Sequence, residues 1–62
     1  MKNWLELAMF YYETYKETPK EKLLEWMKDA IDLDYLHTLS QSDLAILFCE
    51  RMALIGAAEA KQ

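Results

Sequence analysis

Cys49 and His37 are the residues whose types could support nucleophilic catalysis, because a thiolate attacks and an imidazole can take its proton. Cys49 falls in the most apolar stretch of the chain, residues 44–55 (LAILFCERMALI), where a thiol stays protonated and unreactive. The sequence specifies no third group that would orient the histidine. Glu6 and Glu50 have no enforced proximity, so no carboxylate pair is indicated either. We therefore expect no enzyme and no catalytic residue.

The chain also matches poorly the sequence motifs that bind metal ions, phosphate groups or nucleic-acid bases. Asp32 and Asp34 could begin a calcium loop, but the stretch lacks the glycine that an EF-hand needs at its sixth position. The chain has no glycine-rich phosphate loop. Residues 39–45 (LSQSDLA) resemble the first helix of a DNA-reading helix-turn-helix, but the sequence LFCERMALI follows, with one arginine and no turn. We expect no cofactor, no metal and no direct nucleic-acid contact.

Length and charge narrow the class of partner. The 62 residues make one domain, residues 1–62, with 7 basic and 11 acidic side chains and a net charge of −4. This excess of negative charge disfavours binding to phosphate backbones and to anionic membrane surfaces. The longest apolar run, residues 44–49, is far shorter than the ~20 residues that span a bilayer. With a free thiol and no export signal, we expect a cytoplasmic protein, in the source cell or in an infected host cell.

Composition and capping signals predict the secondary structure. One glycine, one proline and 53% apolar residues favour helices over a turn-rich β fold. We expect an all-α, compact three-helix domain, with helices at about 3–16, 19–32 and 41–58. Asn3 and Ser40 are expected to cap the first and third helices. Thr18, Pro19 and Glu21 fit a capping box, with Pro19 at the first helical position.

The second helix has a clear apolar stripe, and the segment after it is expected to fold back. The residues of the stripe are Leu23, Leu24, Met27, Ala30 and Ile31. Trp26 sits on the shoulder of this stripe. Residues 33–39 are expected to form a short helical turn that covers the core.

The third helix is apolar on most of its circumference, and such a helix is normally covered on more than one side. One stripe carries Leu44, Phe48, Met52 and Ile55, and a second carries Leu47 and Leu54 with Arg51 between them. The helix is therefore either the centre of the bundle or part of an interface. In the second case Leu47, Arg51 and Leu54 would contact their own counterparts in a two-fold homodimer.

The run Leu39-Ser40, Asp43-Leu44-Ala45 and Phe48, after a short LLEWM helix, resembles the small enterobacterial Hha nucleoid modulators. The resemblance covers about a third of the chain. It implies a compact helical protein that acts by binding another protein. Met52, Ala53 and Leu54 stand where that family has charged residues, so we infer no membership.

These observations favour a small acidic protein-binding module that modulates or inhibits a larger partner. A tiny protein of a phage or other mobile element, directed at a host factor, would be one such case. A few aromatic anchors usually dominate such interfaces. The candidate partner-binding residues are Glu6, Phe10, Tyr12, Glu13 and Trp26, with the glutamates orienting a basic partner. The alternative is a structural homo-oligomer assembled through the third helix.

Overall fold

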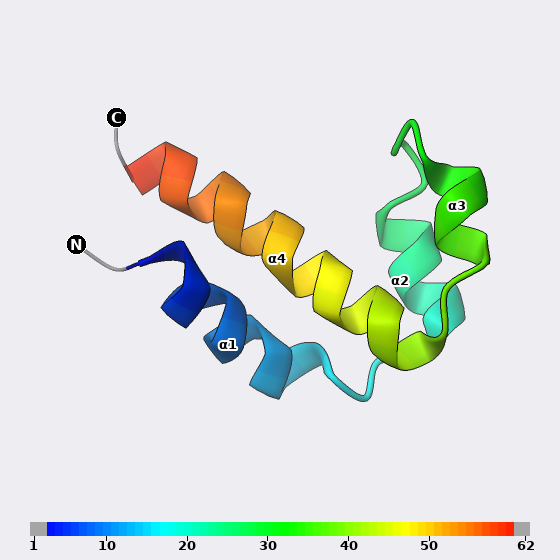
Figure 1. The fold of residues 1–62 in the computed structure, drawn as a ribbon, viewed down its shortest axis with the longest axis horizontal. Helices are drawn as coiled ribbons and strands as arrows, with labels where there is room; N and C mark the ends of the chain where they lie inside the picture. The colour runs from blue at the N-terminus through cyan, green and yellow to red at the C-terminus, as the bar shows by residue number, and fades with distance from the viewer. Residues whose placement is uncertain (1–2, 61–62) are drawn as a thin grey trace.

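The computed structural model describes the backbone of residues 3–60 and the side chains of residues 3–56, and its described residues form four helices (Figure 1). These are α1 (Trp4–Tyr15), α2 (Lys20–Trp26), α3 (Leu33–His37) and α4 (Gln41–Ala60). Residues 3–60 contain no strand. The all-α prediction is confirmed. The prediction of three helices is wrong, because the second helix ends at Trp26 and the short turn expected after it forms a separate fourth helix, α3.

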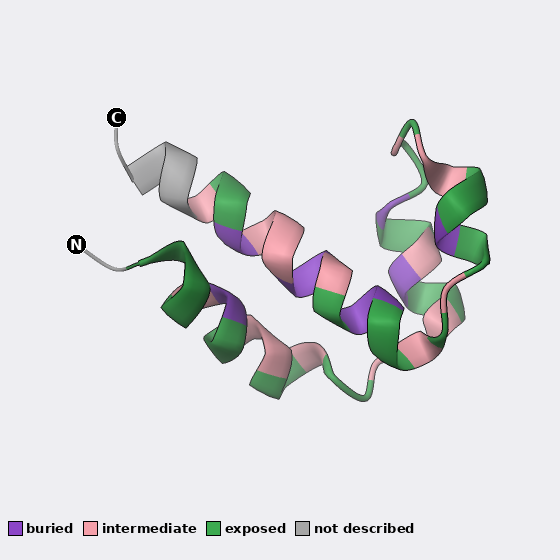
Figure 2. Cartoon of the chain, in the orientation of Figure 1, coloured by how far each residue is buried: buried purple, intermediate pink, exposed green. Residues whose placement is uncertain are grey.

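The long helix α4 is the element on which the others pack. α1 runs antiparallel beside it, α2 packs against its first half, and α3 packs on α2 (Figure 1). The buried residues gather along α4 and on the sides of the neighbouring helices that face it (Figure 2). One cluster forms the main core and consists of Leu23, Met27, Leu36, Leu44, Ala45, Phe48 and Cys49.

Two helices begin where the sequence predicts. The Asn3 side chain accepts a hydrogen bond from the Leu5 amide at 3.1 Å, which caps α1. The Ser40 hydroxyl accepts one from the Asp43 amide at 3.2 Å, which caps α4. Both caps are local, so the sequence alone specifies them.

Gly56 of α4 faces Leu7 and Tyr11 of α1. A Cβ atom at this position would come within 3.1 Å of Cδ2 of Leu7 and 3.8 Å of the Tyr11 hydroxyl oxygen. A contact of 3.1 Å is tight, so the missing side chain lets the two helices lie close together. The helix continues through Gly56.

The predicted capping box before α2 is wrong. The helix begins one residue later than the box requires, with Pro19 in an extended conformation at the N-cap and no side-chain cap. The carbonyl oxygens of this connection are instead bound from α4. Nε2 of Gln41 donates to the carbonyl oxygens of Lys16 and Thr18 at 2.9 and 2.7 Å. This amide therefore fixes the connection between α1 and α2.

The second helix also ends earlier than predicted, at Trp26 rather than about residue 32. Turn-type hydrogen bonds follow, from the Ala30 amide to Met27 and from the Leu33 amide to Ala30. Ile31 is fully exposed on this turn, so its place in the apolar stripe was wrongly predicted. The turn reverses the chain and lets Leu36 of α3 reach the core, where it is fully buried. The expected short helical turn over the core is thus confirmed as α3.

Asp32 and Arg51 join this turn to α4. The guanidinium donates two hydrogen bonds to the carboxylate, at 2.6 and 3.2 Å, in the bidentate geometry that arginine favours. The arginine lowers the pKa of Asp32, and the carboxylate raises the pKa of Arg51. Both side chains are about one-third exposed. The pair holds the chain reversal against the side of α4 that α1 does not cover.

Replacing Asp32 with asparagine is expected to destabilise the fold at neutral pH but not in acid. Because the folded-state pKa of Asp32 is lowered, its contribution is present above the unfolded value of about 4 and is lost as pH falls through the folded value. Thermal unfolding of wild type and Asp32→Asn, followed by circular dichroism from neutral pH to about pH 2, measures this. The difference should shrink below about pH 4.

Asp29→Asn is the matched control, since Asp29 is exposed on the same turn and has no ion pair among the described residues. It should behave like wild type at every pH. A difference between Asp32→Asn and wild type that stayed constant down to the lowest pH would contradict the role given to the ion pair.

Candidate partner-binding surface

The second half of α4 is incompletely covered. α2 packs against its first half, and beyond α2 the only described helix beside it is α1 (Figure 1). Leu54 and Ile55 are 51% and 56% exposed there. Ile46, earlier in α4, is also exposed. An apolar helix thus presents large side chains to solvent on a protein of only 62 residues.

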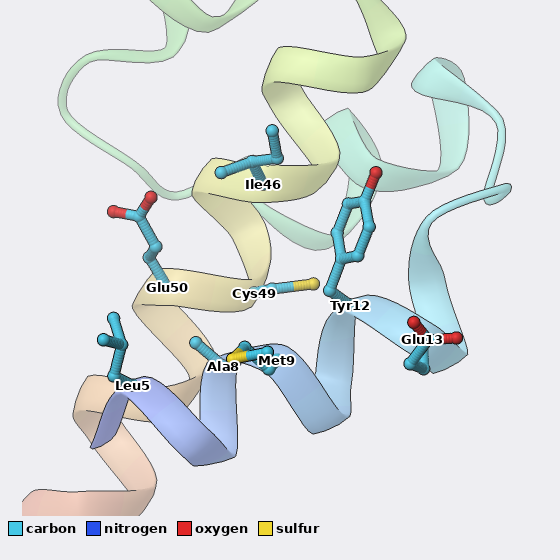
Figure 3. Close-up of a pocket in the computed structure, with 8 residues that line it drawn as sticks. All are labelled: Leu5, Ala8, Met9, Tyr12, Glu13, Ile46, Cys49 and Glu50. Atoms are coloured by element: carbon cyan, nitrogen blue, oxygen red, sulfur yellow. The ribbon is translucent and has the colours of Figure 1, made fainter. Parts of the chain in front are cut away.

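A groove of about 480 Å³ runs between α1 and α4 (Figure 3). Ala8 and Cys49 are buried and form its floor, while Leu5, Met9 and Ile46 are exposed and form its walls. The remaining lining residues are Tyr12, Glu13 and Glu50. Its apolar lining and open form suit the side chains of another macromolecule better than a small polar ligand.

The two carboxylates lie at opposite ends of the groove. Glu50 stands near Leu5 at one end, and Glu13 lies beyond Tyr12 at the other (Figure 3). Oε2 of Glu13 is 3.3 Å from Nζ of Lys16, and both side chains are exposed. No ion pair to Glu50 occurs among the described residues. The groove is therefore apolar along its length and acidic at each end.

Aromatic rings form a continuous row on another side of α1. Phe10, Tyr11 and Tyr15 follow one another with ring centroids 5.9 and 6.4 Å apart. Tyr15 then meets Trp26 and Phe48 edge-on at 5.8 and 5.3 Å. Trp26 and Phe48 are 5.4 Å apart. This aromatic row joins α1 to α2 and α4, and half-exposed Trp26 lies at its α2 end.

The five predicted partner-binding residues do not form one patch. Tyr12 and Glu13 line the groove, whereas Phe10 and Trp26 belong to the aromatic row. At 100° per residue, Phe10 is about 160° around α1 from Tyr12. Glu6 is exposed but does not line the groove.

Sequence reasoning missed most of the groove. Leu5, Met9, Ile46 and Glu50 were not among the predicted partner-binding residues, although all four line it. The available signal was the excess of apolar residues on both helices. Which faces of α1 and α4 meet depends on their packing, which this signal does not specify.

The three candidate dimer residues also have different surroundings. Leu47 is partly buried against the core cluster, and Arg51 is held by Asp32. Leu54 is the one of the three that is exposed. A self-association surface on α4 would therefore centre on Leu54 and Ile55.

Cys49 lies in the groove floor with 1% of its surface exposed. Burial raises the pKa of its thiol, which keeps the sulfur protonated at neutral pH. Residues 3–56 contain no group of three or more His, Cys, Asp or Glu side chains placed to hold a metal ion. His37 is exposed at the end of α3.

No family model, no curated protein and no solved structure matches this chain. The described residues also form no helix that is both long and apolar enough to span a membrane. The interpretation of the groove therefore rests on its own geometry.

Cys49 is expected to react slowly with iodoacetamide in the folded protein, at least about tenfold more slowly than in urea, because the thiol is buried and protonated. Mass spectrometry over a time course at neutral pH measures both rates. Equal rates in the folded and unfolded protein would contradict its placement in the groove floor.

Proposed function

We propose that this protein is a small acidic protein-binding module that modulates a larger protein partner and has no catalysis of its own. The observation that carries the proposal is the open apolar groove between α1 and α4, with a glutamate at each end. Leu5, Met9 and Ile46 are exposed because α1 and α4 bury other side chains against their neighbours. A partner that covers them adds apolar burial that the isolated chain lacks.

The exposed apolar side chains of the groove can supply binding free energy when a partner covers them. Fully burying a leucine or methionine side chain contributes about 1.5–3 kcal/mol. A few such anchors in a groove, with polar groups around them, are the usual source of affinity in a protein interface. Leu5, Met9 and Ile46 can serve as the wall against which anchors of the partner pack. The nearest nucleophile, Cys49, is buried and protonated, which favours binding over chemistry.

Self-assembly is the second candidate, and the exposure of Leu54 and Ile55 favours it. These side chains lie in the half of α4 that α2 and α3 do not cover. A two-fold pair of α4 helices would bury both. The acidic composition of the chain weakens the self-assembly candidate, since each copy has a net charge of −4 and two copies repel each other.

A pull-down from a lysate of the source cells tests the binding function. We expect the wild-type bait to retain one protein in stoichiometric amount, and Met9→Lys to lose it, because Met9 forms a wall of the groove. Phe10→Lys is the matched control: the two side chains are adjacent and 67% and 66% exposed, but only Met9 lines the groove.

The possible results separate three interpretations. Loss of the partner in Phe10→Lys alone would leave the binding function standing and move the binding face to the aromatic row. Loss in Met9→Lys alone supports the groove. Retention of no stoichiometric partner by any bait would contradict the proposed function.

Sedimentation equilibrium tests the second candidate. If the protein acts as a binding module, wild type and Leu54→Glu should both have the mass of one chain. If α4 builds a homodimer, wild type should have twice that mass, and Leu54→Glu should return to the mass of one chain. Leu54 suits this test because it is exposed, whereas Leu47 packs on the core and its replacement would disturb the fold.

A further inference from the structure

We propose that the groove between α1 and α4 takes a single amphipathic helix of the partner, with an apolar stripe flanked at both ends by lysine or arginine. This inference rests on the proposed function and specifies the chemistry of the occupant. It is carried by the length of the groove, by its helical walls and by the placement of its two carboxylates.

The length of the groove fits about two helical turns. Along α1 the lining residues extend from Leu5 to Glu13, and the seven steps from Leu5 to Tyr12 rise about 10 Å. A helix that presents apolar residues at i, i+3 or i+4, and i+7 covers the same distance. Such a helix would also form a three-helix arrangement with α1 and α4.

The charges at the ends define the flanks of the occupant. Glu50 at one end has no ion pair among the described residues, and Glu13 at the other is bound only by the exposed Lys16. An exposed pair of this kind contributes little, so a cation of the partner can replace Lys16 at Glu13 without a large loss. Basic residues on both sides of the apolar stripe would then lie within reach of both carboxylates.

A second copy of this chain fits the groove poorly. Its α1 carries Glu6 and Glu13 on either side of Met9, and its α4 carries Glu50 one turn before Leu54. Either helix would bring carboxylates to a groove that already has one at each end. Like charges that face each other across an interface oppose association, so the observations favour a basic partner helix.

Binding of synthetic peptides to the full chain tests this inference. One labelled peptide of about 16 residues carries leucines at i, i+3, i+4 and i+7 with lysine or arginine on both flanks. The other keeps the leucines and has glutamate on the flanks. Fluorescence anisotropy should give a Kd at least about tenfold lower for the basic peptide, and the difference should narrow at high salt.

Variants of the protein place the peptide in the groove. Glu50→Gln should raise the Kd of the basic peptide about two- to fivefold, the range for an exposed ion pair. Glu21→Gln removes the same charge from exposed Glu21 on α2, which does not line the groove, and should leave the Kd unchanged. Met9→Lys should abolish binding and Phe10→Lys should preserve it. Circular dichroism confirms that each variant is folded.

Each remaining outcome overturns the inference in a distinguishable way. Equal affinity for the two peptides, or equal effects of Glu50→Gln and Glu21→Gln, would show that the carboxylates do not select the occupant. If neither peptide binds while Met9→Lys still loses a cellular partner, the binding function stands and the helical occupant is wrong. If Met9→Lys instead dissociates a dimer of wild-type chains, the groove is a contact between copies.

Discussion

The structure depends on one constraint, which is that α4 is apolar on most of its circumference and belongs to a chain too short to surround it. A domain of about 60 residues buries only about 60% of its unfolded surface. α1 covers one side of α4, and α2, with α3 packed on it, covers another side of its first half. The polar contacts serve the same arrangement. Gln41 fixes the connection that precedes α2, and the Arg51–Asp32 pair holds the turn that precedes α3.

The distribution of this cover explains where the exposed apolar surface lies. Leu44, Ala45, Phe48 and Cys49 meet neighbours from several helices and are buried. Ile46, Leu54 and Ile55 point away from these neighbours and stay exposed. The groove follows from the same geometry, because two antiparallel helices with apolar residues on their flanks leave a channel where no third helix lies. The exposed apolar side chains and the groove therefore have the same origin, which is the incomplete cover of α4.

The sequence predicts features that depend on neighbouring residues, but it does not predict contacts between residues far apart in the chain. The extents of α1 and α4 and the caps at Asn3 and Ser40 agree with the prediction because each depends on neighbouring residues. The predicted continuous helix at 19–32 is wrong because the break depends on packing of Leu36 and on Arg51, which is 19 positions from Asp32. At the candidate site, Tyr12 and Glu13 are the two candidate residues that line the groove, whereas Phe10 was chosen for lying off the expected core face and does not line it. The partners of Tyr12 across the groove, Ile46 and Cys49, come from a helix more than thirty positions away.

Gly56 sets a dimension of the groove without lining it. The spacing of α1 and α4 near the Leu5 end depends on the absence of a side chain at this position, since a Cβ atom would press on Leu7. A residue with a Cβ atom requires either the Leu7 side chain or the helices themselves to shift by a few tenths of an ångström. Where the helices are what shifts, the width of the groove changes through a position that does not line it. The width of the groove is thus set separately from the charges at its two ends.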